Sequence, residues 1–238
     1  MLCTMQLRFL PLVTGLLPIV AIHASLVLAI NAGAIPACIP YFDGCASISA
    51  TGRYEPAVFL FKPAMSAEAI LLVFYWLLNV AWLKELSRSA GTRMGMVAPI
   101  ISALGIVSAF ALLLYVTFLG TQAPFYEFMR RFGIYAYFLF AVIAQLMLAS
   151  QALRLSKQLN FATLAKISRA QLWLATAPFL LGILNLVLKS MLDDADAEEN
   201  VIEWISAMLM QIYIALTYYA WTNTRFSGDL KLRLPASD

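Results

Sequence analysis

Long runs of apolar residues alternate with short polar segments along almost the whole chain. Each run has about 20 residues, the length that an α-helix needs to cross roughly 30 Å of hydrocarbon. The six runs cover residues 9–30, 64–83, 96–118, 132–153, 172–188 and 201–221. Because apolar residues fill these runs continuously, without an alternation of period two, the pattern predicts transmembrane helices and argues against a β-barrel. We therefore expect an all-α, polytopic membrane protein, a six-transmembrane-helix bundle with a polar extracytoplasmic first loop.

The composition agrees with this fold class and excludes others. Of the 238 residues, 62% are hydrophobic and 12% are charged, whereas a soluble domain has about 25% charged residues. The net charge of +3 provides no basic stripe for nucleic acid. With one histidine and three cysteines, we expect no metal site and no cofactor. Short connections and the lack of an internal repeat favour a single transmembrane domain over residues 1–238.

The first run could also be a secretory signal, because Arg8 precedes it and small residues follow it. At roughly 22 residues, however, it is longer than the apolar region of a signal peptide, which has about 7–15 residues. We therefore expect an uncleaved span.

The distribution of Lys and Arg predicts the orientation. With both termini in the cytoplasm, eleven basic residues lie on the cytoplasmic side and five lie outside, which obeys the positive-inside rule. The plasma membrane or the bacterial inner membrane is preferred over the membrane of an organelle.

Two cysteines, Cys38 and Cys45, lie in the predicted outer loop, residues 31–63. They could close a small disulfide ring, which an oxidising outer compartment permits and which would restrain the loop. Free thiols and a redox-active pair are the alternatives. A redox pair would need a second thiol pair on the same side, and Cys3 is predicted on the other side.

The remainder of the outer loop is polar. It carries hydroxyl groups and both signs of charge at Ser49, Thr51, Arg53 and Glu55. Such a segment cannot lie in hydrocarbon, yet the apolar residues 58–61 that follow suggest a return to the mouth of the bundle or to the interface. We expect a folded lid over the helices.

Charged residues gather at the outer ends of four spans. Glu127, Arg130 and Arg131 share one helical face, which Tyr135 continues. Arginine can present two donors to a phosphate, which suits a lipid headgroup. Alternatively, both arginines extend to the interface or pair with Glu127. The remaining residues of the predicted lipid-binding site are Lys62, Glu68, Lys189 and Glu203.

Charge inside a membrane is costly unless it finds a partner, and we expect Glu203 to pair with Arg131. The only histidine, His23, lies about two-thirds of the way across the first span and should approach the same level. It is either a hydrogen-bonded structural residue or, with Glu203, a candidate for acid–base catalysis. Ser47, Ser49 and Thr51 would be remote nucleophile candidates, but no GxSxG motif accompanies them.

Three segments together resemble one known family. They are ISATGRYEP at residues 48–56, YEFMRRFGIYAYF at residues 126–138 and IEW at residues 202–204. In order and position they are similar to the FRAG/DRAM/Sfk family of six-span membrane proteins. The resemblance implies a role in membrane lipid biology, since relatives include a factor that remodels the lipid of GPI anchors, autophagy modulators of lysosomal membranes and a protein that supports phosphoinositide kinase assembly. It implies no catalytic residues.

Three functions follow from these observations. The first is a protein that binds or organises a membrane phospholipid or glycolipid at the outer mouth of the bundle, alone, as a homo-oligomer or with a membrane-protein partner. The second is a membrane enzyme that remodels lipid acyl chains or headgroups. The third is a transporter of small solutes or protons, which ranks last because the charges cluster at one face.

Overall fold

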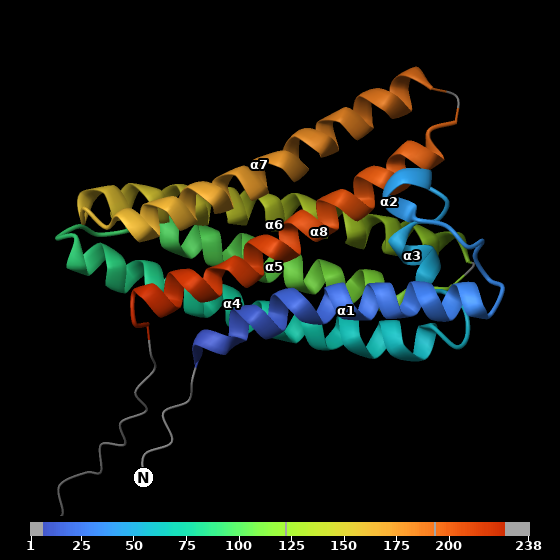
Figure 1. Cartoon of the computed structure of the whole chain (residues 1–238), viewed down its shortest axis with the longest axis horizontal. Coiled ribbons are helices and arrows are strands. Elements are labelled where there is room, and N and C mark those ends of the chain that lie inside the picture. The colour runs from blue at the N-terminus through green and yellow to red at the C-terminus, as the bar shows by residue number, and fades with distance from the viewer. Residues whose placement is uncertain (1–6, 122, 193, 227–238) are drawn as a thin grey trace, which may run out of the picture.

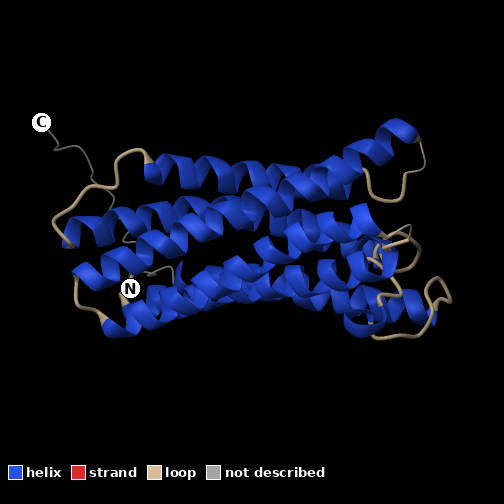
Figure 2. Ribbon diagram, turned by 90° about the horizontal axis from the view of Figure 1, so that it is seen from above, coloured by secondary structure: helices blue, strands red, loops and turns tan. Residues whose placement is uncertain are grey.

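The computed structural model describes residues 7–121, 123–192 and 194–226 of the chain. Within these residues there is no strand, and six helices are long and apolar enough to cross a membrane. The elements are η1 (Leu7–Phe9), α1 (Leu10–Asn31), α2 (Pro40–Asp43), α3 (Ile48–Thr51), α4 (Val58–Ser89), α5 (Val97–Thr117), α6 (Pro124–Gln158), α7 (Ala162–Met191) and α8 (Asp196–Asn223). The prediction of an all-α integral membrane protein with six spans is confirmed (Figures 1 and 2).

The six long helices form a closed ring. Each helix packs against the next in the order α1, α4, α5, α6, α7 and α8, and α8 returns to α1. The start of α1 and the end of α8 lie at one end of the bundle, which we call the terminal end (Figure 1). The short helices α2 and α3 lie at the opposite end, which we call the loop end.

Four of the long helices, α4, α6, α7 and α8, are longer than the predicted spans. One of them is α4, which begins at Val58 and continues through Pro63. Residues 58–61 are therefore the first turn of a membrane helix, and not a separate return to the interface. Phe61 is fully buried in the main core cluster, so packing, which hydropathy does not report, extends the helix past the charged Lys62.

Small residues allow the helices to approach closely. A Cβ atom on Gly133 of α6 would lie 2.7 Å from the backbone nitrogen of Tyr115 in α5. A Cβ atom on Gly15 of α1 would lie 2.7 Å from the backbone nitrogen of Ala215 in α8. Both glycines therefore mark places where two helix backbones touch.

Polar side chains in the core hydrogen-bond one another. Thr217 Oγ1 accepts the Gln171 amide at 2.9 Å and the Tyr75 hydroxyl, also at 2.9 Å. Its own hydroxyl donates to the Tyr213 carbonyl at 3.4 Å, which is why the Tyr75 hydroxyl is assigned as the donor. This network links α4, α7 and α8 in the interior.

Candidate functional site

The first outer loop is fastened to α8. Cys38 and Cys45 form the expected disulfide, with their Cα atoms 6.6 Å apart, and the ring encloses α2. The Gly44 carbonyl accepts the Asn200 side-chain amide at 2.8 Å. Gly44 has a left-handed φ of 59° and lies against the backbone of Ala197. The disulfide loop is therefore docked on the first turns of α8.

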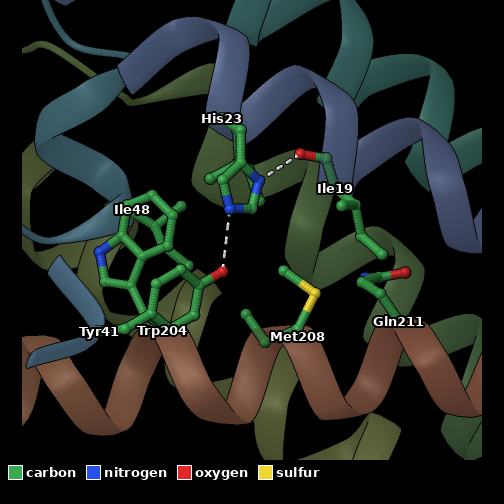
Figure 3. A pocket seen from close by; sticks show the side chains of 9 residues that line it. Ile19, His23, Tyr41, Ile48, Trp204, Met208 and Gln211 are labelled. Carbon is green, nitrogen blue, oxygen red and sulfur yellow. Dashed lines mark hydrogen bonds between the residues drawn. The ribbon is translucent and has the colours of Figure 1, made fainter. Parts of the chain in front are cut away.

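Three aromatic rings continue this attachment. The Trp204 indole donates to the Ala46 carbonyl at 2.8 Å. The ring of Tyr41 contacts Trp204 edge-on at a centroid distance of 5.2 Å and stacks on His23 at 5.9 Å. The loop, α1 and α8 thus meet at one aromatic cluster, which is part of the pocket in Figure 3.

Both ring nitrogens of His23 are engaged. Nδ1 lies 2.7 Å from the Ile19 carbonyl and Nε2 lies 3.0 Å from the Tyr41 hydroxyl (Figure 3). Because a carbonyl only accepts, Nδ1 carries the proton, and in the neutral ring Nε2 accepts from Tyr41. Burial raises the pKa of the Tyr41 phenol, so this hydroxyl keeps the proton that it donates.

The pocket beside this cluster is small and mostly apolar. It has an empty volume of about 220 Å³, including the part open to solvent. The enclosed cavity volume is only about 10 Å³, close to the space that one water molecule needs. Its lining residues are Ile19, Ile22, His23, Tyr41, Ile48, Trp204, Ala207, Met208 and Gln211. The pocket therefore has room for no more than about one water molecule next to the hydrogen-bonded histidine.

A second cluster, which we call the arginine–serine cluster, consists of Ser49, Arg53, Tyr115, Arg130 and Glu203. Ser49 Oγ accepts from Arg53 Nη2 at 3.3 Å and makes a long contact of 3.5 Å with Arg130 Nη1. Ser49 Oγ also lies 3.0 Å from the hydroxyl oxygen of Ser47, the N-cap residue of α3. Two guanidinium groups, from the loop and from α6, therefore converge on one hydroxyl.

The same cluster contains a carboxylate and two buried donors. Glu203 interacts with Arg130 electrostatically and accepts a hydrogen bond from the backbone of Ile48. Arg130 Nε and the Tyr115 hydroxyl are both buried, and neither has a hydrogen-bond partner among the described residues. Tyr115 also interacts electrostatically with Arg53, Arg130 and Glu203. The cluster can therefore supply additional donors next to both signs of charge.

The structure places Arg130, and not Arg131, near Glu203. Arg131 is exposed and takes part in no ion pair among the described residues, so the expected Glu203–Arg131 pair is not formed. One residue rotates a side chain by about 100° around a helix with 3.6 residues per turn. Adjacent arginines consequently face different surroundings.

A third cluster, the lysine bridge, joins α7, α8 and α6 at the loop end. Lys189 Nζ contacts Glu199 Oε1 at 2.6 Å and the Tyr135 hydroxyl at 3.3 Å. The Tyr135 hydroxyl donates to Glu199 Oε1 at 3.2 Å. Tyr135 and Lys189 were predicted site residues, while Glu199 was not. Its opposite charge, ten residues after Lys189, is the signal that could have indicated it.

The remaining predicted residues differ in their surroundings. Glu68 is fully buried inside α4, and neither of its carboxylate oxygens has a hydrogen-bond partner among the described residues. Thr51 is buried and donates to the Ile48 carbonyl, which closes α3. Glu55 is exposed, Lys62 is half-buried, and Glu127 is half-buried within electrostatic reach of the α6 arginine in the cluster. Glu68 thus faces the helix core, apart from the loop-end clusters.

Sequence reasoning missed several contributors to these clusters. Tyr41, Asn200 and Tyr115 are ordinary residues in sequence, with no motif around them, and only packing brings them to the loop end. Trp204 appeared as an interface residue, although it is 1% exposed. Their roles depend on contacts between segments far apart in the chain.

Comparison with known protein families gives a match over most of the chain. Residues 6–223 match the sequence model of the family described as Frag1/DRAM/Sfk1/Cwh43P N-terminal domain. This range includes all six long helices and the disulfide loop. No curated protein and no solved structure matches the chain.

Proposed function

The chain belongs to the Frag1/DRAM/Sfk1/Cwh43P N-terminal domain family, and on that premise we propose that it binds, and so organises, a membrane phospholipid or glycolipid at the loop end of its bundle. One observation carries this proposal. Two arginines converge on Ser49 beside the Glu203 carboxylate, and the buried Arg130 Nε has no partner among the described residues.

The charges suit a phosphate-bearing headgroup. Guanidinium groups bind phosphate oxygens through short, charge-assisted hydrogen bonds. Arg53 and Arg130 would provide these donors, and the Tyr115 hydroxyl would add a neutral donor. Glu203 would favour a headgroup that also carries a cationic or hydroxyl group. This orientation requires the loop end to face the outside, with both termini in the cytoplasm, as the positive-inside rule predicts.

Two adjacent arginines provide a matched test. We expect purified Arg130→Ala protein to lose lipid relative to the unmodified protein, whereas Arg131→Ala, which removes an exposed arginine, should retain it. A hydrogen bond to a charged group contributes about 1.5–3 kcal/mol, so the affinity should fall by a factor of about 10 to 100.

The measurement is mass spectrometry of the phospholipid and glycolipid that copurify with each variant in the same detergent. Thermal unfolding checks that both variants are folded. If a folded Arg130→Ala protein retained as much lipid as Arg131→Ala, the arginine–serine cluster would not be the headgroup site.

One observation favours an enzyme as the alternative. His23 and Tyr41 are hydrogen-bonded at the wall of the apolar pocket, close to Trp204. A remodelling enzyme could use such a pair for proton transfer, provided that the Tyr41 hydrogen bond is exchanged for one to substrate. Time-dependent conversion of defined lipids that is lost in His23→Ala would favour the enzyme. No turnover across a broad lipid panel would argue against it.

A further inference from the structure

The loop-end half of α7 is exposed except on one face, where Leu181, Asn185 and Leu188 are half-buried. The last buried residue of this helix is Pro178, and residues 179–191 include none that is buried. In the best apolar window of α7, 17% of residues are buried, against 39–44% in the other five spans. Figure 1 shows this half of α7 diverging from the bundle, while the other half lies alongside it. A helix that packed closely against the bundle would bury that face fully, whereas here the face is only half-buried.

Open space lies on the face of α7 that points to the bundle. Ala175, Pro178, Gly182 and Lys189 follow one another at intervals of three, four and seven residues, so they share one helical face. The first two are buried, and the last contacts α8 and α6. Between them, Gly182 is exposed, and no described atom lies within 4 Å of the position that its Cβ would take. We call this space the α7 gap.

The facing side of α6 changes at the same depth. Val142 lies 16 residues before the end of α6 and is 5% exposed, and Pro178 lies 16 residues after the start of α7. Because both helices rise by 1.5 Å per residue, these two residues are level. Towards the loop end, Leu139 and Tyr135 continue the Val142 face and are 52% and 53% exposed. The α6 wall of the gap is therefore open where the α7 wall is open.

Contacts of α7 itself close the gap at both ends. Pro178 packs into the bundle on the terminal side, and the lysine bridge ties Lys189 to Glu199 and Tyr135 on the loop side. An occupant must therefore enter sideways from the bilayer. A transmembrane helix, with a diameter of about 10–12 Å, would need α7 to detach at one of these ends. A flexible hydrocarbon chain would not.

We propose that the α7 gap is a binding site for one acyl chain of a phospholipid. Its walls are apolar where Leu139 and Leu186, which lies one helical turn after Gly182, are exposed, and this matches hydrocarbon. The lysine bridge at its loop end provides a cation at headgroup level. Glu199 of this bridge lies one turn from Glu203 and interacts with it electrostatically, so the loop end of the gap lies next to the arginine–serine cluster. This inference rests on the proposed lipid binding and adds where the chain of that lipid lies.

Two tryptophan substitutions on opposite faces of α7 test the site. Gly182→Trp places an indole in the gap, while Leu180→Trp places one on the outward face, where Leu180 is 58% exposed. The purified full chain is reconstituted with palmitoyl-oleoyl phosphatidylcholine, washed with detergent and analysed by native mass spectrometry. We expect the retained phospholipid to fall about tenfold in Gly182→Trp, because the indole takes the packing surface of the chain, and to stay unchanged in Leu180→Trp. Equal retention in the two variants would overturn the site.

A spin label identifies the occupant independently and serves if Gly182→Trp does not fold. Gly182→Cys carries a nitroxide in a Cys3→Ser background, in phosphatidylcholine nanodiscs. We expect it to collide with molecular oxygen as often as a label at Leu180→Cys does. Protection equal to that of a label at the buried Ala175→Cys would show that α7 closes on the bundle. Dipolar broadening between labels would show that a second copy fills the gap. Either result overturns the proposal.

The variants separate this inference from the proposed function. Loss of lipid in Arg130→Ala with retention in Gly182→Trp would reject the acyl-chain site and keep the headgroup site. The reverse pattern would keep the acyl-chain site and reject the headgroup site. Retention in both variants would reject both.

Discussion

Gly44 is the residue at which the disulfide loop touches the backbone of α8, and we expect Gly44→Ala to undock the loop. The residue has a left-handed φ of 59°, which costs an L-residue about 1–2 kcal/mol. An added Cβ would also lie 2.7 Å from the carbonyl carbon of Ala197 and closer still to its carbonyl oxygen. Backbone cannot rotate away as a side chain can, so either the loop or α8 must shift.

The loss of stability caused by the steric clash in Gly44→Ala can be measured separately from the cost of backbone strain. Forcing an extra carbon into a packed contact costs about 1–3 kcal/mol, and the shift stretches the hydrogen bond from Asn200 to the Gly44 carbonyl, a further contribution of about 1 kcal/mol. Gly33 is the matched control, because it has a left-handed φ of 70° but no described atom within 4 Å of its Cβ position. Gly44→Ala should therefore be about 2–4 kcal/mol less stable than Gly33→Ala.

Thermal unfolding of the two variants in the same detergent measures this difference. In a chain of this size each kcal/mol shifts Tm by about 2–4 °C, so the Tm of Gly44→Ala should be lower by about 4–16 °C. The fluorescence that is lost in Trp204→Phe is the signal of Trp204 among the five tryptophans, and it reports locally on the docked loop, since the Trp204 indole donates to the Ala46 carbonyl. Equal Tm values for both alanine variants would refute the docking argument.

Three further outcomes are expected. Replacing Cys38 and Cys45 by serine should lower stability by about 2–3 kcal/mol, because the disulfide restrains a short loop of the unfolded chain; unchanged unfolding in detergent would contradict this. Loop docking should be fully present below pH 10.0, the ordinary pKa of tyrosine, and weaken as the pH rises towards the raised folded-state pKa of Tyr41. A pH titration of Trp204 fluorescence should show this change, and Tyr41→Phe should abolish it. Thr217→Val should cost about 1–3 kcal/mol, because the buried Tyr75 hydroxyl loses this acceptor and the Gln171 amide keeps only the longer contact of 3.4 Å to the Tyr213 carbonyl. Thermal unfolding equal to that of the unmodified protein would exclude the network as a source of stability.

Much of the fold could be predicted from local sequence. Transfer of about 20 apolar residues into hydrocarbon is favourable whatever their neighbours are, so the six spans were visible without any tertiary information. The disulfide between Cys38 and Cys45 was also accessible, because six intervening residues already hold the two cysteines near each other. The positions of the helix ends were harder to predict from the sequence. Hydropathy stops at charged residues such as Lys62, whereas the helix continues wherever its backbone remains hydrogen-bonded and packed.

The candidate site depended on the direction in which each side chain points from its helix, and a hydropathy pattern does not report that direction. Arg130 and Arg131 are the same residue type in adjacent positions, and the rotation of α6 decides that only Arg130 faces Glu203. Tyr41 and His23 meet because the loop is docked on α8, which involves contacts over more than 150 residues of chain, from Gly44 to Asn200.

The sequence by itself determined that this chain lies in a membrane as six helices, because burial of apolar residues in lipid is a sum over local segments. Only the tertiary structure decided which charged residues share a cluster and where α7 leaves the bundle. Gly182 has the same sequence character as the tightly packed Gly15, and only the placement of a neighbouring backbone distinguishes open space from close contact. Contacts between distant segments depend on helix rotation, depth and tilt, which are properties of the whole packed bundle.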